Sequence, residues 1–239
     1  MKTIYIFFLL LFVSNPASGQ YFKNLNVYDG LPNNTVKCFA MDKQGFIWMG
    51  TFNGLTRFQG FNFSNYHHKD WDPESLAGNH IESLLATKDG LYIGTNAGLD
   101  FFSFKNQVFQ HCFYVSGISK IMRLGASILI LSNSGNVWQK KNAETSFRYM
   151  SGKRWRAITP YGKHHILILT DKKLILADIH LKPLSRISVS NLPTSGNVLY
   201  YSKNLNRILI GSGIGYPGKC YKIDACHRLH TAKLRIPSD

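Results

Sequence analysis

The fold of this chain is decided by residues 45–55, which read Gly-Phe-Ile-Trp-Met-Gly-Thr-Phe-Asn-Gly-Leu. Residues 47–51 form a short, mostly apolar run that is rich in side chains favouring strands. Asn53-Gly54 comes next, and it is the strongest short hairpin signal because a type I′ turn needs a positive φ at both central residues. The stretch therefore predicts a strand over 46–51, a turn at Asn53-Gly54 and a second strand that begins at Leu55.

The same pattern returns at residues 90–99, which read Gly-Leu-Tyr-Ile-Gly-Thr-Asn-Ala-Gly-Leu. Three weaker copies follow, and in every copy a hydroxyl residue ends the second strand. The five positions are Thr51, Thr95, Ser132, Thr170 and Ser212, with gaps of 44, 37, 38 and 42 residues. A repeat of about 40 residues that contains four short strands is typical of a β-propeller blade.

The chain is therefore predicted to be an all-β protein, a β-propeller of four-stranded antiparallel blades. The propeller region is 35–239, with five blades at about 35–70, 80–115, 117–151, 155–190 and 196–235. Unbroken apolar runs in the second strands, such as residues 128–131, indicate burial on both faces.

Residues 20–34 are predicted to be an N-terminal closing strand, over 21–28, and a link to the first blade. Two arrangements fit this prediction. The strand closes a five-bladed ring, or the blades form an open arc that is an incomplete part of a larger propeller. An open arc leaves a blade face unpaired, which is costly in water.

The first 19 residues are typical of a cleaved signal peptide. Met1-Lys2 gives the positive start, residues 4–13 are apolar without a break, and small residues precede the expected cleavage after Gly19. This apolar run is too short to cross a bilayer as a helix. The mature protein is therefore expected in the periplasm. A buried N-terminal strand or an uncleaved anchor is the alternative.

The 239 residues carry a formal net charge of +15, with 13% aromatic and 17% charged residues. This composition excludes a disordered chain. The basic residues are scattered, apart from residues 153–156 and 172–173, and no nucleic-acid-binding motif accompanies them. We therefore expect a solvated basic surface and no nucleic acid partner. An anionic ligand or an envelope surface is the alternative.

Residues 42–51, followed by Gly54-Leu55, resemble the two-component regulator propeller repeat. Residues 28–36 are similar to the segment that opens the first blade in that family. The resemblance is close over residues 21–115, whereas the later repeats are placed by spacing. It implies the N-terminal periplasmic sensor region of a hybrid two-component system of the kind found in Bacteroidetes.

The function that this resemblance implies is that of a non-catalytic periplasmic sensor for polysaccharide use. Many such sensors respond to polysaccharide breakdown products, so an oligosaccharide is the expected ligand. The expected partners are further propeller blades or domains of a full-length sensor, and a homodimer of that sensor. Kinase activity and phosphorelay are expected in a C-terminal region that this chain lacks. The alternatives are a secreted propeller enzyme, either a lyase or a hydrolase, and a plain protein-interaction scaffold.

No catalytic residue, metal site or cofactor is assigned from the sequence, and the ligand-binding residues stay unknown. The groups considered as metal ligands are His67-His68, His164-His165, and Cys226-His227 with His230. Adjacent histidines on a strand point to opposite faces, and the third group lacks a fourth ligand.

Aromatic and motif residues have structural interpretations. Trp71 and His80 lie on the loop between the first two repeats, where a ring could stack on a sugar. A buried loop anchor is the expected role, since such rings usually bury. Gly50 and Gly54 are expected to allow turn geometry and close approach, and Thr51 to satisfy backbone groups at the strand end.

The four cysteines are Cys38, Cys112, Cys220 and Cys226. An oxidising compartment permits disulfides, but four cysteines allow three pairings and the sequence does not choose between them. We expect small apolar residues in strands. A bridge between Cys220 and Cys226 across a hairpin is the alternative.

Overall fold

The computed structural model describes residues 23–115, 117–142, 144–151, 155–189, 198–211, 219–224 and 229–232. The predicted signal peptide, residues 1–19, lies outside this described part, as do Cys226 and His227. Within it, no helix is long and apolar enough to span a membrane.

Five four-stranded antiparallel sheets make up the described chain, and the strands of each sheet lie side by side in chain order. Blade 1 contains β1 (Val36–Met41), β2 (Ile47–Thr51), β3 (Gly54–Phe58) and β4 (Phe63–Tyr66). Blade 2 contains β5 (Ile81–Ala86), β6 (Gly90–Thr95), β7 (Gly98–Ser103) and β8 (Phe109–Tyr114). Blade 3 contains β9 (Ile118–Leu124), β10 (Ser127–Ser132), β11 (Val137–Lys141) and β12 (Arg148–Ser151). Blade 4 contains β13 (Ala157–Tyr161), β14 (His165–Leu169), β15 (Lys173–Asp178) and β16 (Pro183–Ser188). Blade 5 contains β17 (Val198–Ser202), β18 (Arg207–Gly211), β19 (Lys219–Ile223) and β20 (Leu229–Ala232). The predicted all-β propeller with five four-stranded blades is confirmed.

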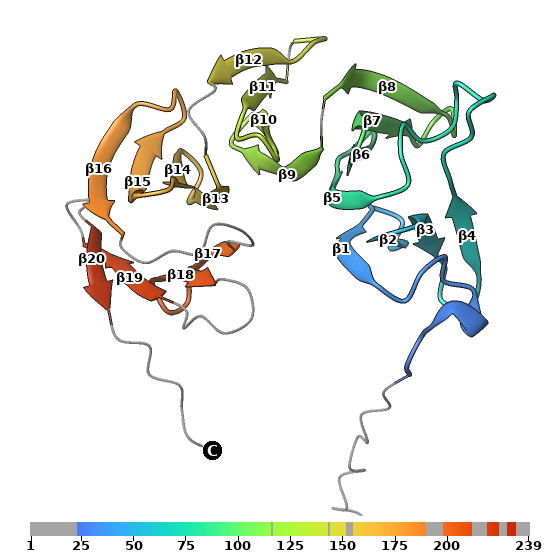
Figure 1. Ribbon diagram of the computed structural model, residues 1–239, viewed down its shortest axis with the longest axis horizontal. Coiled ribbons are helices and arrows are strands. Elements are labelled where there is room, and N and C mark those ends of the chain that lie inside the picture. The colour runs from blue at the N-terminus through green and yellow to red at the C-terminus, as the bar shows by residue number, and fades with distance from the viewer. Residues whose placement is uncertain are drawn as a thin grey trace, which may run out of the picture.

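The blades follow one another around an open arc (Figure 1). The first strand of each blade lies on the inner side of the arc, and the fourth strand lies at the outer rim. Blades 1 and 5 form the two ends of the arc and are not side by side. Of the two predicted arrangements, the structure therefore has the open arc.

The core consists of four clusters of buried hydrophobic residues, one between each pair of consecutive blades. Blades 1 and 2 share the cluster around Trp48 and Phe102, and blades 2 and 3 share the one around Ile118. None of the four clusters joins blade 5 to blade 1. Each inner blade thus buries both of its faces, which explains the unbroken apolar runs of its second strand.

The repeated Gly-Thr pair controls how closely the blades pack. A Cβ added at Gly50 would lie 2.5 Å from Ile81 Cγ2 and 2.6 Å from Cys38 Sγ. Gly94 has the same place in blade 2, where an added Cβ would lie 2.6 Å from Ile118 Cγ2. The glycine lets the first strand of the next blade approach, so the role predicted for Gly50 is confirmed.

The turn after β2 differs from the prediction. The β2–β3 register places Thr51 opposite Gly54, so the loop residues are Phe52 and Asn53. Gly54 has a φ of +110°, but Asn53 does not have a positive φ. The predicted type I′ turn centred on Asn53-Gly54 is therefore wrong. The physical reason is that Thr51 Oγ1 accepts the Asn53 N–H at 3.1 Å, while the Gly54 N–H donates to the Asn79 carbonyl at 2.7 Å.

A hydroxyl side chain at the end of the second strand holds the following loop in blades 1 to 4. Thr51 and Thr95 each donate to the carbonyl oxygen three residues later, at 2.8 and 3.1 Å. Ser132 accepts a backbone N–H at 3.1 Å, and Thr170 donates to a carbonyl oxygen at 3.0 Å. The role predicted for Thr51 is confirmed. Ser212, the fifth position, lies outside the described residues.

The N-terminal segment is a second correction. Its described residues, 23–35, contain no strand, and Val27–Asp29 forms one turn of 3-10 helix, η2, beside β4 (Figure 1). Asn26 Oδ1 accepts the Tyr28 N–H at 2.8 Å, and the Asn26 N–H donates to Asp29 Oδ2 at 2.9 Å. These local bonds form a capping box, which competes with strand pairing. The predicted closing strand is therefore not formed over residues 23–28.

Candidate ligand-binding groove

β11 sends successive side chains to opposite neighbours, as the two-residue period of a strand requires. Val137 is buried between blades 3 and 4, whereas Trp138 packs against the cluster between blades 2 and 3. Gln139 and Lys140 continue the alternation, because Gln139 lines a hollow beside blade 4 and Lys140 lines a groove beside blade 2. Blade 3 therefore contributes to two separate sites at the rim of the arc.

The larger site is the groove between blades 2 and 3, with a volume of about 510 Å³. Its walls are formed by residues 110–115, which include most of β8, by residues 145–147, and by Trp138 and Lys140. We call it the aromatic groove. Its size is within the range of sites for small organic ligands.

Three rings that line the aromatic groove, those of Phe113, Trp138 and Phe147, give it its character, and the Tyr149 ring packs beside them. The Trp138 ring centroid lies 5.3 Å from that of Phe113 and 5.7 Å from that of Tyr149. Phe147 completes the set, 5.6 Å from Phe113. Three of these side chains are half-buried, and Tyr149 is exposed. They form a partly open aromatic wall that is fixed by ring–ring packing.

Lys140 places a cation at the same wall. Its Nζ donates a hydrogen bond of 3.0 Å to the Tyr92 hydroxyl. The ammonium group lies 5.7 Å from the centroid of the Tyr92 ring and 5.8 Å from that of Phe147. These cation–π contacts hold the lysine stem against the rings. The groove can therefore present an apolar ring face and a polar hydrogen-bonding group to one ligand.

The geometry is that of a binding site. Ring faces beside hydroxyl, amide and ammonium groups suit a ligand with an apolar face and polar edges, such as a sugar. In the described part of the chain, no group of three or more His, Cys, Asp or Glu side chains is placed to hold a metal ion.

None of these groove residues was predicted from the sequence as a ligand-binding residue. The alternation in residues 137–141 places Trp138 and Lys140 on one face, and that signal was available. Their proximity to Phe113 results from packing between blades, which the repeat pattern does not specify. A map of the repeats onto adjacent blades would have been needed to find the groove.

Trp71 contradicts its predicted role. Its side chain is 82% exposed, so it is not the buried anchor of the loop between blades 1 and 2. Leu76 fills that role and is fully buried. His80 is exposed and makes an edge contact with Phe52 at 5.3 Å between ring centroids. The exposed Trp71 ring is thus a second surface on which a sugar could stack.

Two of the histidines that were considered as metal ligands, His68 and His230, contact other groups. His68 Nδ1 bonds the Leu76 carbonyl oxygen, and its Nε2 lies 3.0 Å from Asp70 Oδ1. His230 Nε2 lies 3.0 Å from Asp224 Oδ2. His227 lies outside the described residues.

Two of the four cysteines, Cys38 and Cys112, are free thiols. Cys38 packs against the cluster between blades 1 and 2, so the prediction of a small apolar strand residue is confirmed for it. Burial raises the pKa of the Cys38 thiol to about 12, and a protonated thiol is a poor nucleophile. Whether Cys220 and Cys226 pair stays a prediction, since Cys226 lies outside the described residues.

Comparison with known proteins finds a family match in the first blade. Residues 30–53 match the sequence model of the two-component regulator propeller family. Blade 1 carries a two-component regulator propeller repeat. Histidine kinase P4 of Formosa agariphila is 34% identical to this chain over 83 residues, a match that covers 32% of this chain and 6% of the kinase.

Solved structures share the fold of this chain. The extracellular domain of the hybrid two-component system BT3049 of B. thetaiotaomicron has a TM-score of 0.69 and 20% identity, over 85% of this chain and 30% of that chain. The extracellular domain of BT4673 from the same organism has a TM-score of 0.66 and 16% identity, over 89% of this chain and 29% of that chain. The fold is shared, and this chain spans less than a third of either structure.

Proposed function

We propose that this chain is part of the extracytoplasmic, non-catalytic sensor propeller of a hybrid two-component system, and that it binds an oligosaccharide. The observation that carries this proposal is the regulator propeller repeat in blade 1, within a fold shared with extracellular domains of such systems. That fold also supports a location outside the cytoplasm. Phosphorelay would belong to kinase parts that lie beyond this chain.

The two ends of the arc support the presence of further blades. On blade 1, Phe39 and Met41 are 64% and 68% exposed, and on blade 5, Val198 and Tyr200 are 63% and 56% exposed. At the equivalent positions of the inner blades, apolar residues of this size are covered by the neighbouring blade. We propose that additional blades of a full-length sensor cover both end faces, which would remove this apolar surface from water.

The aromatic groove is the proposed oligosaccharide site. Trp138 and Phe147 offer ring faces, and Lys140 adds a hydrogen-bonding group beside them. A sugar ring has an apolar face and hydroxyl edges, so one bound ring can use both features at once. The groove volume of about 510 Å³ leaves room for more than one sugar ring.

Isothermal titration calorimetry of the chain against a panel of neutral oligosaccharides tests this proposal. At least one should bind, and Trp138→Ala should weaken it about tenfold, which corresponds to ~1.4 kcal/mol of lost contact. Ser146→Leu, at an exposed groove position, should also weaken binding without removing any ring. Thermal unfolding of each variant confirms that it remains folded.

Trp71→Ala is the matched control, because it removes an exposed tryptophan that does not line the groove. It should leave the affinity unchanged. Loss of binding in Trp71→Ala with none in Trp138→Ala would move the site to the loop between blades 1 and 2. Absence of heat for the whole panel, with a folded chain, would contradict the oligosaccharide proposal.

A further inference from the structure

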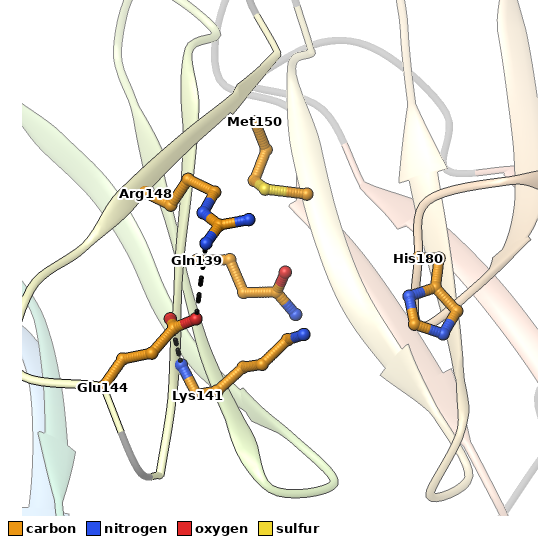
Figure 2. A pocket seen from close by; sticks show the side chains of 6 residues that line it. All are labelled: Gln139, Lys141, Glu144, Arg148, Met150 and His180. Carbon is orange, nitrogen blue, oxygen red and sulfur yellow. Dashed lines mark hydrogen bonds and ion pairs between the residues drawn. The ribbon is translucent and has the colours of Figure 1, made fainter.

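A second hollow lies on the opposite side of β11, between blades 3 and 4 (Figure 2). Its volume is about 170 Å³, a third of the volume of the aromatic groove, so it suits a smaller ligand of about one sugar ring. It is lined by Gln139, Lys141, Glu144, Arg148, Met150 and His180. The first five belong to blade 3, and His180 faces them from the turn between β15 and β16 (Figure 2).

Gln139 places a buried polar side chain at the bottom of the hollow. The residue is 6% exposed, and its Nε2 donates to the Ser127 hydroxyl at 3.0 Å. Its Oε1 accepts no hydrogen bond from any described residue, and the amide is directed into the hollow (Figure 2). Because the Ser127 hydroxyl can donate as well as accept, the amide can present either its oxygen or its NH₂ group. A buried amide with one unpaired polar atom is costly, and a hydroxylated ligand would satisfy it.

The walls of the hollow carry more positive than negative groups. Arg148 Nη2 lies 3.8 Å from Glu144 Oε1, and the other Glu144 oxygen accepts the Lys141 backbone N–H at 3.1 Å. The Lys141 ammonium and the His180 ring make no ion pair within the described residues. One carboxylate therefore faces two permanent cations and an imidazole, which leaves a net positive hollow.

We propose that this hollow binds a uronate, a single sugar ring that carries a carboxylate. Its carboxylate would pair with Lys141 and Arg148, because charge-assisted hydrogen bonds to a carboxylate are the strong ones. One of its hydroxyl groups would bond the free polar atom of Gln139. The site is separate from the aromatic groove, since Trp138 and Gln139 point to opposite sides of blade 3.

Three ligands separate charge from hydroxyl recognition in a titration of the full chain: glucuronate, glucose and inorganic sulfate. Glucuronate should bind with a Kd of about 1 mM, which is ordinary for a ligand of one ring. Glucose has the same ring without the carboxylate, and it should bind at least about tenfold more weakly. Sulfate has the charge without the hydroxyl groups, and it should also bind more weakly than glucuronate.

Substitutions in the hollow show which residues determine the affinities for glucuronate and sulfate. Lys141→Gln and Arg148→Gln should each weaken glucuronate binding about tenfold, and both side chains are exposed, so the fold is retained. Gln139→Leu should weaken glucuronate and leave sulfate unchanged, because it removes only the hydroxyl partner. Lys88→Gln is the matched control, an exposed lysine in the β5–β6 turn, and it should change neither affinity.

Three results would overturn the proposal. Equal binding of glucuronate and glucose would remove the role of the cations. Sulfate binding as tight as that of glucuronate, with no effect of Gln139→Leu, would leave only general attraction of anions. A folded chain that binds no glucuronate would exclude the site, and this outcome is independent of Trp138 and of the oligosaccharide titration.

Discussion

Trp48 Nε1 donates a hydrogen bond of 2.8 Å to Asp42 Oδ2 within blade 1. The second carboxylate oxygen of Asp42 accepts the N–H groups of Gln44 and Phe46, both at 3.0 Å. Trp48 is fully buried, and its ring centroid lies 5.3 Å from that of Phe102 in blade 2. One carboxylate thus fixes both the β1–β2 turn and the indole that fills the first interface between blades.

Asp42→Ala should lower the free energy of unfolding by about 2–4 kcal/mol, because three donors lose their acceptor and Trp48 Nε1 is buried without one. Urea unfolding followed by tryptophan fluorescence measures the change. Glu74→Ala is the control at an exposed carboxylate in the loop between blades 1 and 2, with an expected change within about 0.5 kcal/mol. Equal effects of the two substitutions would contradict the role of Asp42.

Gly50→Ala should destabilise the chain by about 1–3 kcal/mol, because its Cβ would overlap Ile81 and force the blades apart. Gly211 is the matched control, since it has the same place in β18 but lies at the open end of the arc. A Cβ at Gly211 would lie 3.7 Å from Val198 Cβ, an ordinary contact. Thermal unfolding should show a lowered Tm for Gly50→Ala alone; a similar loss in both would show that the next blade is not the cause.

Thr51→Val should lower the free energy of unfolding by about 1–2 kcal/mol, since the Asn53 N–H loses its bond to a fully buried hydroxyl. Thr170→Val removes the same kind of bond, from the Lys173 N–H, at a more exposed position, where water can replace the hydroxyl. Its expected cost is less than half as large. Chemical denaturation of both variants compares them, and the reverse order would be inconsistent with burial as the determining factor.

Asp100 introduces a dependence on pH. It is fully buried, its Oδ1 lies 2.8 Å from His111 Nδ1, and its Oδ2 accepts the Ala77 N–H at 2.8 Å. Burial raises the pKa of Asp100 above its ordinary value of 3.8, and the bonds from His111 and Ala77, with the charge of His68, oppose the rise only in part. The folded state therefore binds this proton more tightly than the unfolded state.

The sign of the effect follows from linkage. The contribution of Asp100 is fully present below the unfolded pKa of 3.8 and is lost as the pH rises through the higher folded pKa. Relative to Asp100→Asn, the unmodified chain should lose stability as the pH is raised from 3.8 towards neutral. Urea unfolding across this range gives the difference in the free energy of unfolding. A difference that stays constant, or that grows in favour of the unmodified chain, would contradict the raised pKa.

Much of the fold could be predicted because its signals are local. Gly50 and Thr51 act within one hairpin or on the adjacent strand, and their spacing repeats in blade 2. The prediction failed where hydrogen bonds to a side chain take the place of the usual hydrogen bonds between backbone groups. Thr51 holds the Asn53 N–H and shifts the turn, and Asn26 forms a capping box where a strand was expected.

The candidate sites could not be predicted in the same way. Trp138 and Phe113 belong to different blades, and only the packing of those blades brings their rings together. The hollow beside Gln139 likewise needs His180 from the next blade. Trp71 was expected to be buried because aromatic rings on such loops usually bury, whereas Leu76 occupies the interior of that loop.

Hydrogen–deuterium exchange with and without the tightest-binding neutral oligosaccharide tests whether the aromatic groove is the binding site, because it locates the ligand on the chain. We expect slower exchange in residues 110–115 and 145–147, which line the aromatic groove, and no change in residues 67–80. Slower exchange confined to residues 67–80, around Trp71, or no change at a saturating concentration, would contradict it.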